Sequence, residues 1–102
     1  MPAFYELPIL SIPSQEFSTV LNGYDCKFKV QYNRWNDRWS FDLTINDELK
    51  LSGRRIVTGV DLIGLFNFDI GELWAFKMNE EAEPDRTQLP DGLVRFVSVQ
   101  DV

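Results

Sequence analysis

The chain has 102 residues, 44% of them hydrophobic and 14% aromatic, so we expect one small domain with one core. Sixteen acidic residues against ten basic ones give a formal net charge of −6, which argues against nucleic acid and anionic membranes as partners. One cysteine and no histidine exclude an internal disulfide, a Ser-His-Asp triad and a Cys/His zinc site.

Residues 1–12 predict an extended N-terminal arm or an edge strand, and residues 13–102 predict a single β domain. Leu7 and Ile9 alternate as in a strand, but the proline between them cannot donate to a ladder. Because these residues and Leu10 are too apolar to remain in water, we expect the arm to pair with a neighbouring chain. It lacks the basic region and long apolar run of a signal peptide, so we expect a chain that is cytosolic at synthesis.

The stretch Glu16–Gly53 predicts a β-meander, interpreted as three strands joined by two tight turns. Asn22-Gly23 is a strong hairpin signal, because a type I′ turn needs positive φ at both central residues. Asn36-Asp37 and Asn46-Asp47 interrupt the pattern and predict further turns.

Apolar and polar residues alternate strictly over 24–33 and over 39–46. A period of two places the two sets on opposite faces of a pleated strand, so the meander has one apolar face that the remaining chain must cover. The residues predicted on that face are Tyr24, Cys26, Phe28, Val30, Tyr32, Trp39, Phe41, Leu43 and Ile45.

After the meander, residues 60–68 predict an ordered apolar crossover with at most one turn of 3₁₀ helix. Leu73–Met78 is largely apolar on both faces, so we expect a strand that is at the centre of a sheet or lies under a partner. The polar stretch Asn79–Leu89 predicts a solvated, mobile loop, and Leu93–Gln100 predicts the last strand. About seven short strands indicate an all-β domain, a small sandwich or barrel built on the antiparallel meander.

Few residues suggest chemistry. A carboxylate pair between Asp42 and either Asp25 or Glu48 is conceivable, but acidic residues on the polar face of a sheet mostly serve solvation. An acidic cluster in the polar loop lacks the oxygen spacing of a calcium loop. Cys26 fits a small buried hydrophobe, and Arg54-Arg55 fits local salt bridges better than anion capture. The acidic cluster comprises Glu80, Glu81, Glu83 and Asp85. We therefore predict a protein that is not an enzyme, with no cofactor and no metal.

Trp35 lies beside a predicted turn, between Arg34 and Arg38. Its ring could pack in the core, stack on a guanidinium or a sugar, or anchor a protein partner. Aromatic and arginine side chains are typical anchors of protein interfaces. The predicted interface residues are Leu7, Ile9, Leu10, Arg34, Trp35, Arg38, Glu80, Glu81 and Asp85.

The opening pattern resembles the N-terminal signature of small baseplate plug proteins of contractile-tailed, cyanophage-type bacteriophages. That signature comprises Ile9, Ile12-Pro13, Gln15, Phe17 and the run Thr19–Gly23. Later segments are also similar to this family over nearly the whole chain. They are Arg38–Leu43, Leu51 with Gly53, Arg55–Val57, Leu62–Phe68, Gly71–Leu73, Pro84–Leu89 and Leu93–Val97.

The resemblance implies an all-β structural protein of the virion, located at the tail baseplate and in the host cytoplasm during assembly. It implies packing on hub, spike or inner tube proteins in a three- or six-fold assembly, which would hold the baseplate before contraction. A different function also fits the residues: a soluble β-barrel that binds sugar or peptide, with Trp35 or Trp74 as the platform. A small enzyme that uses carboxylates is a third hypothesis.

Overall fold

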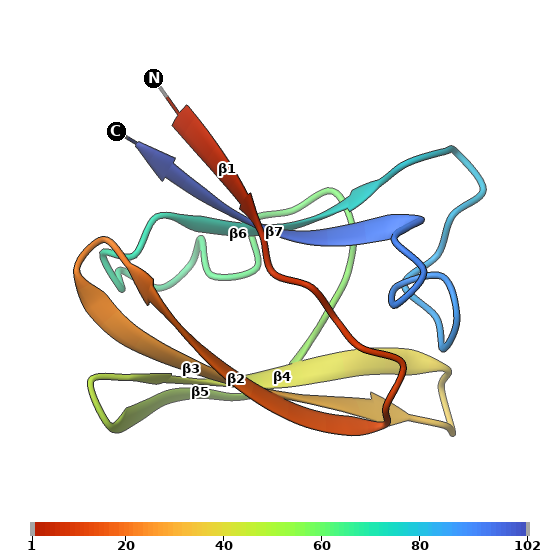
Figure 1. Ribbon diagram of the computed structural model, residues 1–102, viewed down its shortest axis with the longest axis horizontal. Coiled ribbons are helices and arrows are strands. Elements are labelled where there is room, and N and C mark those ends of the chain that lie inside the picture. The colour runs from red at the N-terminus through yellow and green to blue at the C-terminus, as the bar shows by residue number, and fades with distance from the viewer. Residues whose placement is uncertain (1, 102) are drawn as a thin grey trace.

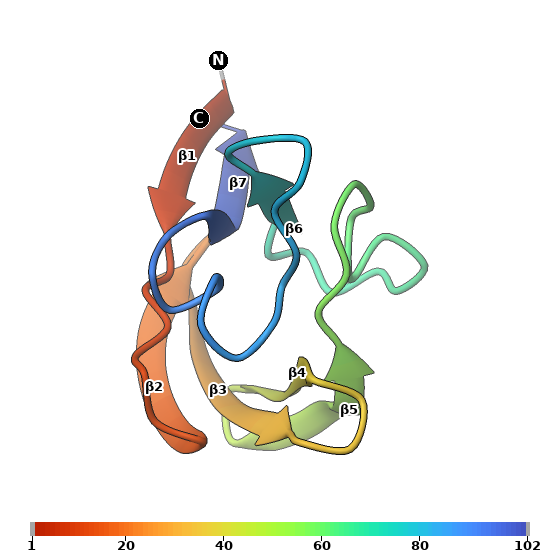
Figure 2. The ribbon, with the colours of Figure 1, turned by 90° about the vertical axis from the view of Figure 1, so that its right-hand side faces the viewer.

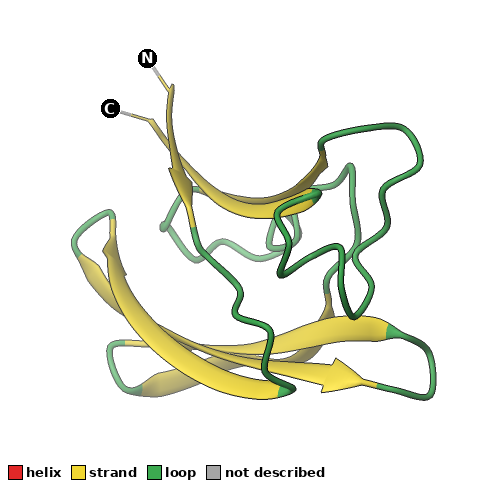
Figure 3. Ribbon diagram, turned by 45° about the vertical axis from the view of Figure 1, so that its right-hand side comes forward, coloured by secondary structure: helices red, strands yellow, loops and turns green. Residues whose placement is uncertain are grey.

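Seven strands form two antiparallel sheets that face each other in the computed structural model, which describes residues 2–101 (Figure 1). Loops and turns make every connection, and no helix occurs within that range (Figure 3). The all-β prediction is therefore confirmed, and the arrangement of two facing sheets is a sandwich. The strands are β1 (Pro2–Glu6), β2 (Ser14–Leu21), β3 (Tyr24–Asn33), β4 (Arg38–Ile45), β5 (Glu48–Arg55), β6 (Glu72–Lys77) and β7 (Val94–Asp101).

The larger sheet is the predicted meander, in the order β2-β3-β4-β5. It has four strands and three turns instead of the predicted three strands and two turns, because β5 also pairs along β4. Asn22 and Gly23 have φ of 51° and 82°, as the predicted type I′ turn requires. Asn46 and Asp47 also have positive φ, 48° and 65°, so the third turn uses the same chemistry.

The alternation in β3 and β4 sets the buried face of this sheet. Phe28 pairs with Leu43 and Val30 pairs with Phe41, and all four side chains are buried. Their neighbours along each strand point to solvent or are half-buried. The register therefore confirms the predicted apolar face, because residues opposite each other in a pair share a face.

The smaller sheet has the order β1-β7-β6, so the C-terminal strand is central. Of the two predicted positions for residues 73–78, the central one is wrong, whereas a strand under a partner agrees with the hydrogen bonds that Gly59 and Leu62 donate to β6. β6 lies at an edge because β1 occupies the other side of β7. Leu73 and Ala75 point into the core, while Trp74 and Phe76 stack on the outer face with ring centroids 5.7 Å apart.

The N-terminal region completes this domain. β1 pairs with β7, and the Leu7 N–H donates to the Phe96 carbonyl at 2.7 Å. Leu7 and Ile9 are only 5% and 6% exposed. The expectation that these two side chains meet a neighbouring chain is therefore wrong, since this chain's own core buries them. Leu10, at 59% exposure, does point to solvent.

The crossover between β5 and β6 contains hydrogen-bonded turns over residues 61–66 but no helix, and Leu62 and Ile63 anchor it in the core. It runs beside β6, where the Leu62 N–H donates to the Leu73 carbonyl at 2.7 Å. Arg54 donates to the Leu62 carbonyl at 3.0 Å, so this arginine ties β5 to the crossover instead of forming the expected salt bridge.

Residues 78–93, called here the closing loop, cover one end of the sandwich between the two sheets (Figure 2). The expectation that this segment is solvated is wrong for Ala82, Pro84 and Leu89, which are buried. The polar residues between them make side-chain hydrogen bonds that hold the turns of the loop in place.

The core joins both sheets. The rings of Phe28 and Phe41 from the larger sheet meet that of Phe96 from β7, with centroid distances of 5.5–6.0 Å. Ser98 and Gln100 are buried polar residues on β7, and the Gln100 amide donates to the Ile70 carbonyl and to Ser98 Oγ, both at 2.7 Å. Their polar atoms therefore add no unsatisfied group to the core.

Candidate functional site: a protein interface around Trp35

Trp35 is the most exposed aromatic side chain that the structure describes, at 87%, so core packing does not account for it. It stands in the turn between β3 and β4, where its N–H donates to Asn33 Oδ1 at 2.9 Å. The Arg34 guanidinium lies 5.3 Å from the centre of its ring, a cation–π distance. A fixed backbone thus presents an indole and a guanidinium side by side.

The turn that carries Trp35 is fixed to the closing loop. Arg38 lies 3.4 Å from Glu83, and Asp37 accepts a hydrogen bond from the Arg86 N–H at 3.1 Å. The Tyr32 hydroxyl donates to the same Asp37 carboxylate at 2.6 Å, which raises the pKa of Tyr32 above its ordinary value. Two segments that are far apart in sequence are therefore in contact at this end of the molecule.

Asp85 holds the closing loop from within. Its carboxylate accepts hydrogen bonds from the Gln88 N–H at 2.9 Å, the Gln88 amide at 2.7 Å and Thr87. Burial alone would raise the pKa of Asp85, but these hydrogen bonds outweigh it and lower the pKa below its ordinary value. The Asp85 carbonyl also accepts from the indole N–H of the buried Trp39 at 2.8 Å.

Arg86 connects this end of the molecule to residues 7–13, the segment between β1 and β2 that we call the N-terminal coil. Its guanidinium donates to Ser11 Oγ at 3.2 Å and lies over the ring of Tyr32 at 5.6 Å. Gln15 braces the same coil, because its amide donates to the Leu10 carbonyl and accepts from the Leu10 N–H. What we call the Trp35 surface comprises the exposed side chains of Leu10, Ile12, Arg34, Trp35 and Glu83 and the half-buried side chain of Arg38.

The predicted interface residues thus divide into three groups. Arg34, Trp35, Arg38 and Asp85 lie together at one end, although Asp85 serves the loop itself, and Leu10 is joined to them through its neighbour Ser11. Glu80 and Glu81 are exposed on the closing loop. Leu7 and Ile9 lie in the core. Sequence reasoning missed Asp37 and Arg86, since no local pattern signals a contact between segments 49 residues apart.

Other polar residues have structural roles. Asp42 pairs across the sheet with Lys29 instead of with Asp25, and its carboxylate accepts from the Gly53 N–H at 2.7 Å, which stabilises an irregularity in β5. Burial raises the pKa of the Cys26 thiol, which therefore remains in its unreactive form. Within residues 2–101 no group of three or more acidic or cysteine side chains is placed to hold a metal ion, and no helix could cross a membrane.

Comparison with known proteins adds a family. A family model described as "Cyanophage baseplate Pam3 plug gp18" matches residues 4–100, which is nearly the whole chain. No protein with a curated description matches the sequence. The family match agrees with the resemblance carried by the opening signature and the later strand segments.

Proposed function

The chain belongs to the cyanophage baseplate plug family, and from this membership we propose that it is a structural subunit of a contractile phage tail. In this proposal the chain packs on hub, spike or inner tube proteins and stabilises the baseplate before contraction. It carries out no catalysis, assembles with three- or six-fold symmetry, and is present in the host cytoplasm until the tail forms.

The Trp35 surface is the structural feature that supports this proposal, because its residues are of the kinds found at protein interfaces. Interface hot spots are rich in Trp, Tyr and Arg. Trp35 and Arg34 are solvent-exposed, yet the turn below them is held by Asp37 and Arg38 through contacts to the closing loop. An exposed tryptophan beside an arginine, on a turn that contacts the closing loop, fits a docking site for another protein.

The experiment is a Trp35→Ala substitution, tested by complementation of a phage that lacks the wild-type gene. We expect the free energy of unfolding to stay within about 1 kcal/mol of wild type, because surface changes rarely cost more. We expect the yield of infectious particles to fall. The measurements are a urea unfolding curve of the purified chain and a plaque count with mass spectrometry of purified tails.

Trp35→Phe is the matched control, since it keeps an aromatic ring over which Arg34 can stack. It should retain more assembly than Trp35→Ala. The proposal is wrong if purified tails lack the chain, or if Trp35→Ala assembles as well as wild type.

A shallow hollow of about 440 Å³ beside Trp35 favours one alternative function, binding of a sugar or peptide ligand. Gln31 and Ser40 line it and supply polar groups next to the ring. A saturable change of Trp35 fluorescence with sugars or short peptides, absent in Trp35→Ala, would support that function over assembly.

A further inference from the structure

The backbone of β2 is unpaired along one side. β2 lies at the edge of the larger sheet and pairs only with β3. The Tyr32 N–H donates to the Pro13 carbonyl, so alternate residues from Pro13 onward bond to β3. The N–H and C=O groups of Glu16, Ser18 and Val20 therefore point away from the sheet. Within residues 2–101 no other segment forms a hydrogen bond with them.

The other sheet edges carry features that discourage pairing. The crossover covers β6, as Gly59 and Leu62 donate to its carbonyls. β5 contains register shifts, a glycine at φ 68° and Lys50, which twist and charge the edge. β1 has only five residues and begins with proline. β2 has eight residues in unbroken register, with no glycine, proline or lysine and with Glu16 as its one charged residue, which makes it the best suited of the four edges to accept a strand.

Two hollows flank the unpaired stretch. One, of about 410 Å³, lies toward β1, with Tyr5, Leu7 and Leu21 among its lining residues. The other, of about 310 Å³, lies over the outer face of the sheet and includes Asp25 and Asp47. Both are bordered by Thr19 and Val20. Side chains of an extended strand project alternately to opposite sides, so a strand paired with β2 would direct them to the two hollows in turn.

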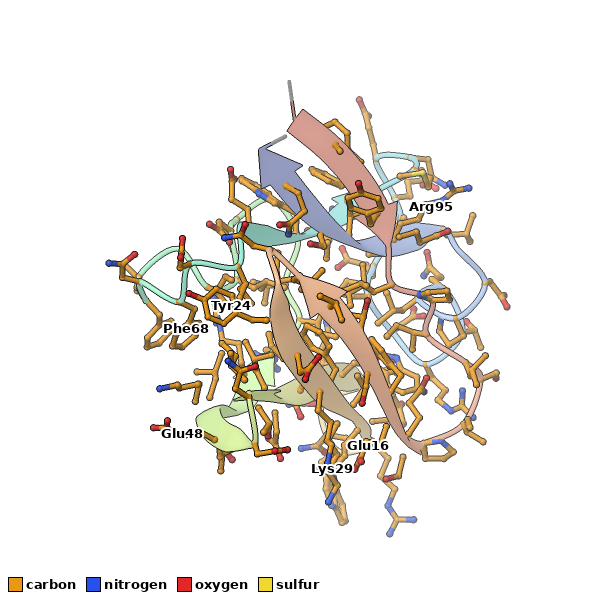
Figure 4. The ribbon with its side chains drawn as sticks, turned by 60° about the vertical axis from the view of Figure 1, so that its left-hand side comes forward. Glu16, Tyr24, Lys29, Glu48, Phe68 and Arg95 are labelled. Atoms are coloured by element: carbon orange, nitrogen blue, oxygen red, sulfur yellow. The ribbon has the colours of Figure 1, made fainter. Side chains whose placement is uncertain are left out.

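The charges beside this edge indicate which occupant fits. Figure 4 shows Glu16 on β2 and Lys29 on the neighbouring β3 on the outer face of the sheet. Three carboxylates (Glu16, Asp25 and Asp47) and two amines (Lys27 and Lys29) lie around the edge, so carboxylates are in the majority; Lys27, which also lines the outer hollow, is 3.7 Å from Glu16. Two copies of a chain with a net charge of −6 would bring like charges together.

We propose that β2 is a docking edge for an extended segment of another baseplate protein, which adds a fifth strand to the sheet. The segment alternates apolar side chains, directed to the hollow beside Leu7 and Leu21, with basic or polar ones directed to the hollow beside Asp25 and Asp47. This inference rests on the proposed baseplate function and is independent of the Trp35 surface.

Hydrogen–deuterium exchange with residue resolution tests it on the wild-type chain, free and within purified tails. In the free chain the amides of Glu16, Ser18 and Val20 should exchange fast, while those of Phe17 and Thr19, which are bonded to β3, should be protected. In tails the first three should become protected. Unchanged fast exchange in tails that contain the chain overturns edge docking alone, whereas tails without the chain overturn this inference and the proposed function together.

Ser18→Pro is the matching variant, because proline removes an N–H that points away from β3 and is tolerated on an edge strand. We expect incorporation into tails to fall about tenfold or more, relative to Ser18→Ala, which keeps the N–H. Equal incorporation of the two variants overturns the inference, and if Ser18→Pro does not fold, the exchange experiment decides. Protection that appears in the free chain as its concentration rises means that a second copy occupies the edge, which also overturns it.

Discussion

Trp35 and Trp39 lie only four residues apart, but one is exposed to solvent and the other belongs to the core. Trp39 falls in the alternating register of β4 and is completely buried, whereas Trp35 stands in the preceding turn and is exposed. The strand period therefore decides the environment of Trp39, as expected. Nothing local decides that of Trp35, because its exposure depends on whether another segment covers the turn.

Asp85 makes the stability of the closing loop depend on pH. Its lowered pKa means that the folded state favours the charged carboxylate, so the stabilising contribution is complete above the ordinary aspartate pKa of about 4. That contribution is lost as the pH falls through the lower folded pKa. At pH 7 we expect Asp85→Ala to lower the free energy of unfolding by about 1–3 kcal/mol, which urea unfolding measures.

Urea unfolding of wild type and Asp85→Ala at pH 7, 4 and 3 tests whether the charge of Asp85 causes the difference. The difference in unfolding free energy between wild type and Asp85→Ala should shrink as the pH falls. The substitution removes the charged carboxylate at every pH, whereas in wild type the carboxylate loses its charge only when it is protonated at low pH. A difference that stays constant down to pH 3 would mean that the charge of Asp85 contributes nothing.

At the scale of elements, the N-terminal coil shows how one short segment can serve both core and surface. Leu7 and Ile9 close the sandwich beside β7, while Leu10 points outward next to Ser11 and its contact with Arg86. The coil therefore belongs to this domain, and the apolar residues that suggested a neighbouring chain are covered internally.

A pair of substitutions in this coil measures that division. Leu7→Ala removes a side chain that is 5% exposed and should lower the free energy of unfolding by about 2–5 kcal/mol, since it leaves a cavity. Leu10→Ala makes the same chemical change at 59% exposure and should cost no more than about 0.5 kcal/mol. Equal unfolding midpoints in urea for the two variants would show that the coil does not pack as described.

At the scale of the whole molecule, the two sheets share one core and should unfold together. The buried residues form one continuous cluster in which Phe96 from the smaller sheet contacts Phe28 and Phe41 from the larger one. We expect a single cooperative transition, as is usual for domains of this size. Circular dichroism, which reports the strands, and tryptophan fluorescence should give coincident thermal midpoints, and separate midpoints would contradict a shared core.

The chain order of the strands and the faces of the meander could be predicted from the sequence because their causes are local. Alternation over 24–33 and 39–46 sets which side chains face inward, and Asn-Gly and Asn-Asp pairs supply the positive φ that the turns require. Trp35 could likewise be singled out as a candidate interface residue, since an aromatic residue among arginines beside a turn is a local signal, but its exposure could not.

Only the tertiary structure decided which segments meet. The hydrogen bonds of Arg86 to Ser11 and of Trp39 to Asp85 join residues 75 and 46 positions apart, and no periodicity reports such contacts. The same holds for the insertion of β7 between β1 and β6, which left β6 at an edge, and for the burial of Leu7. A local pattern states which face of a segment is apolar, but the partner that covers that face is chosen by the packing of the entire chain.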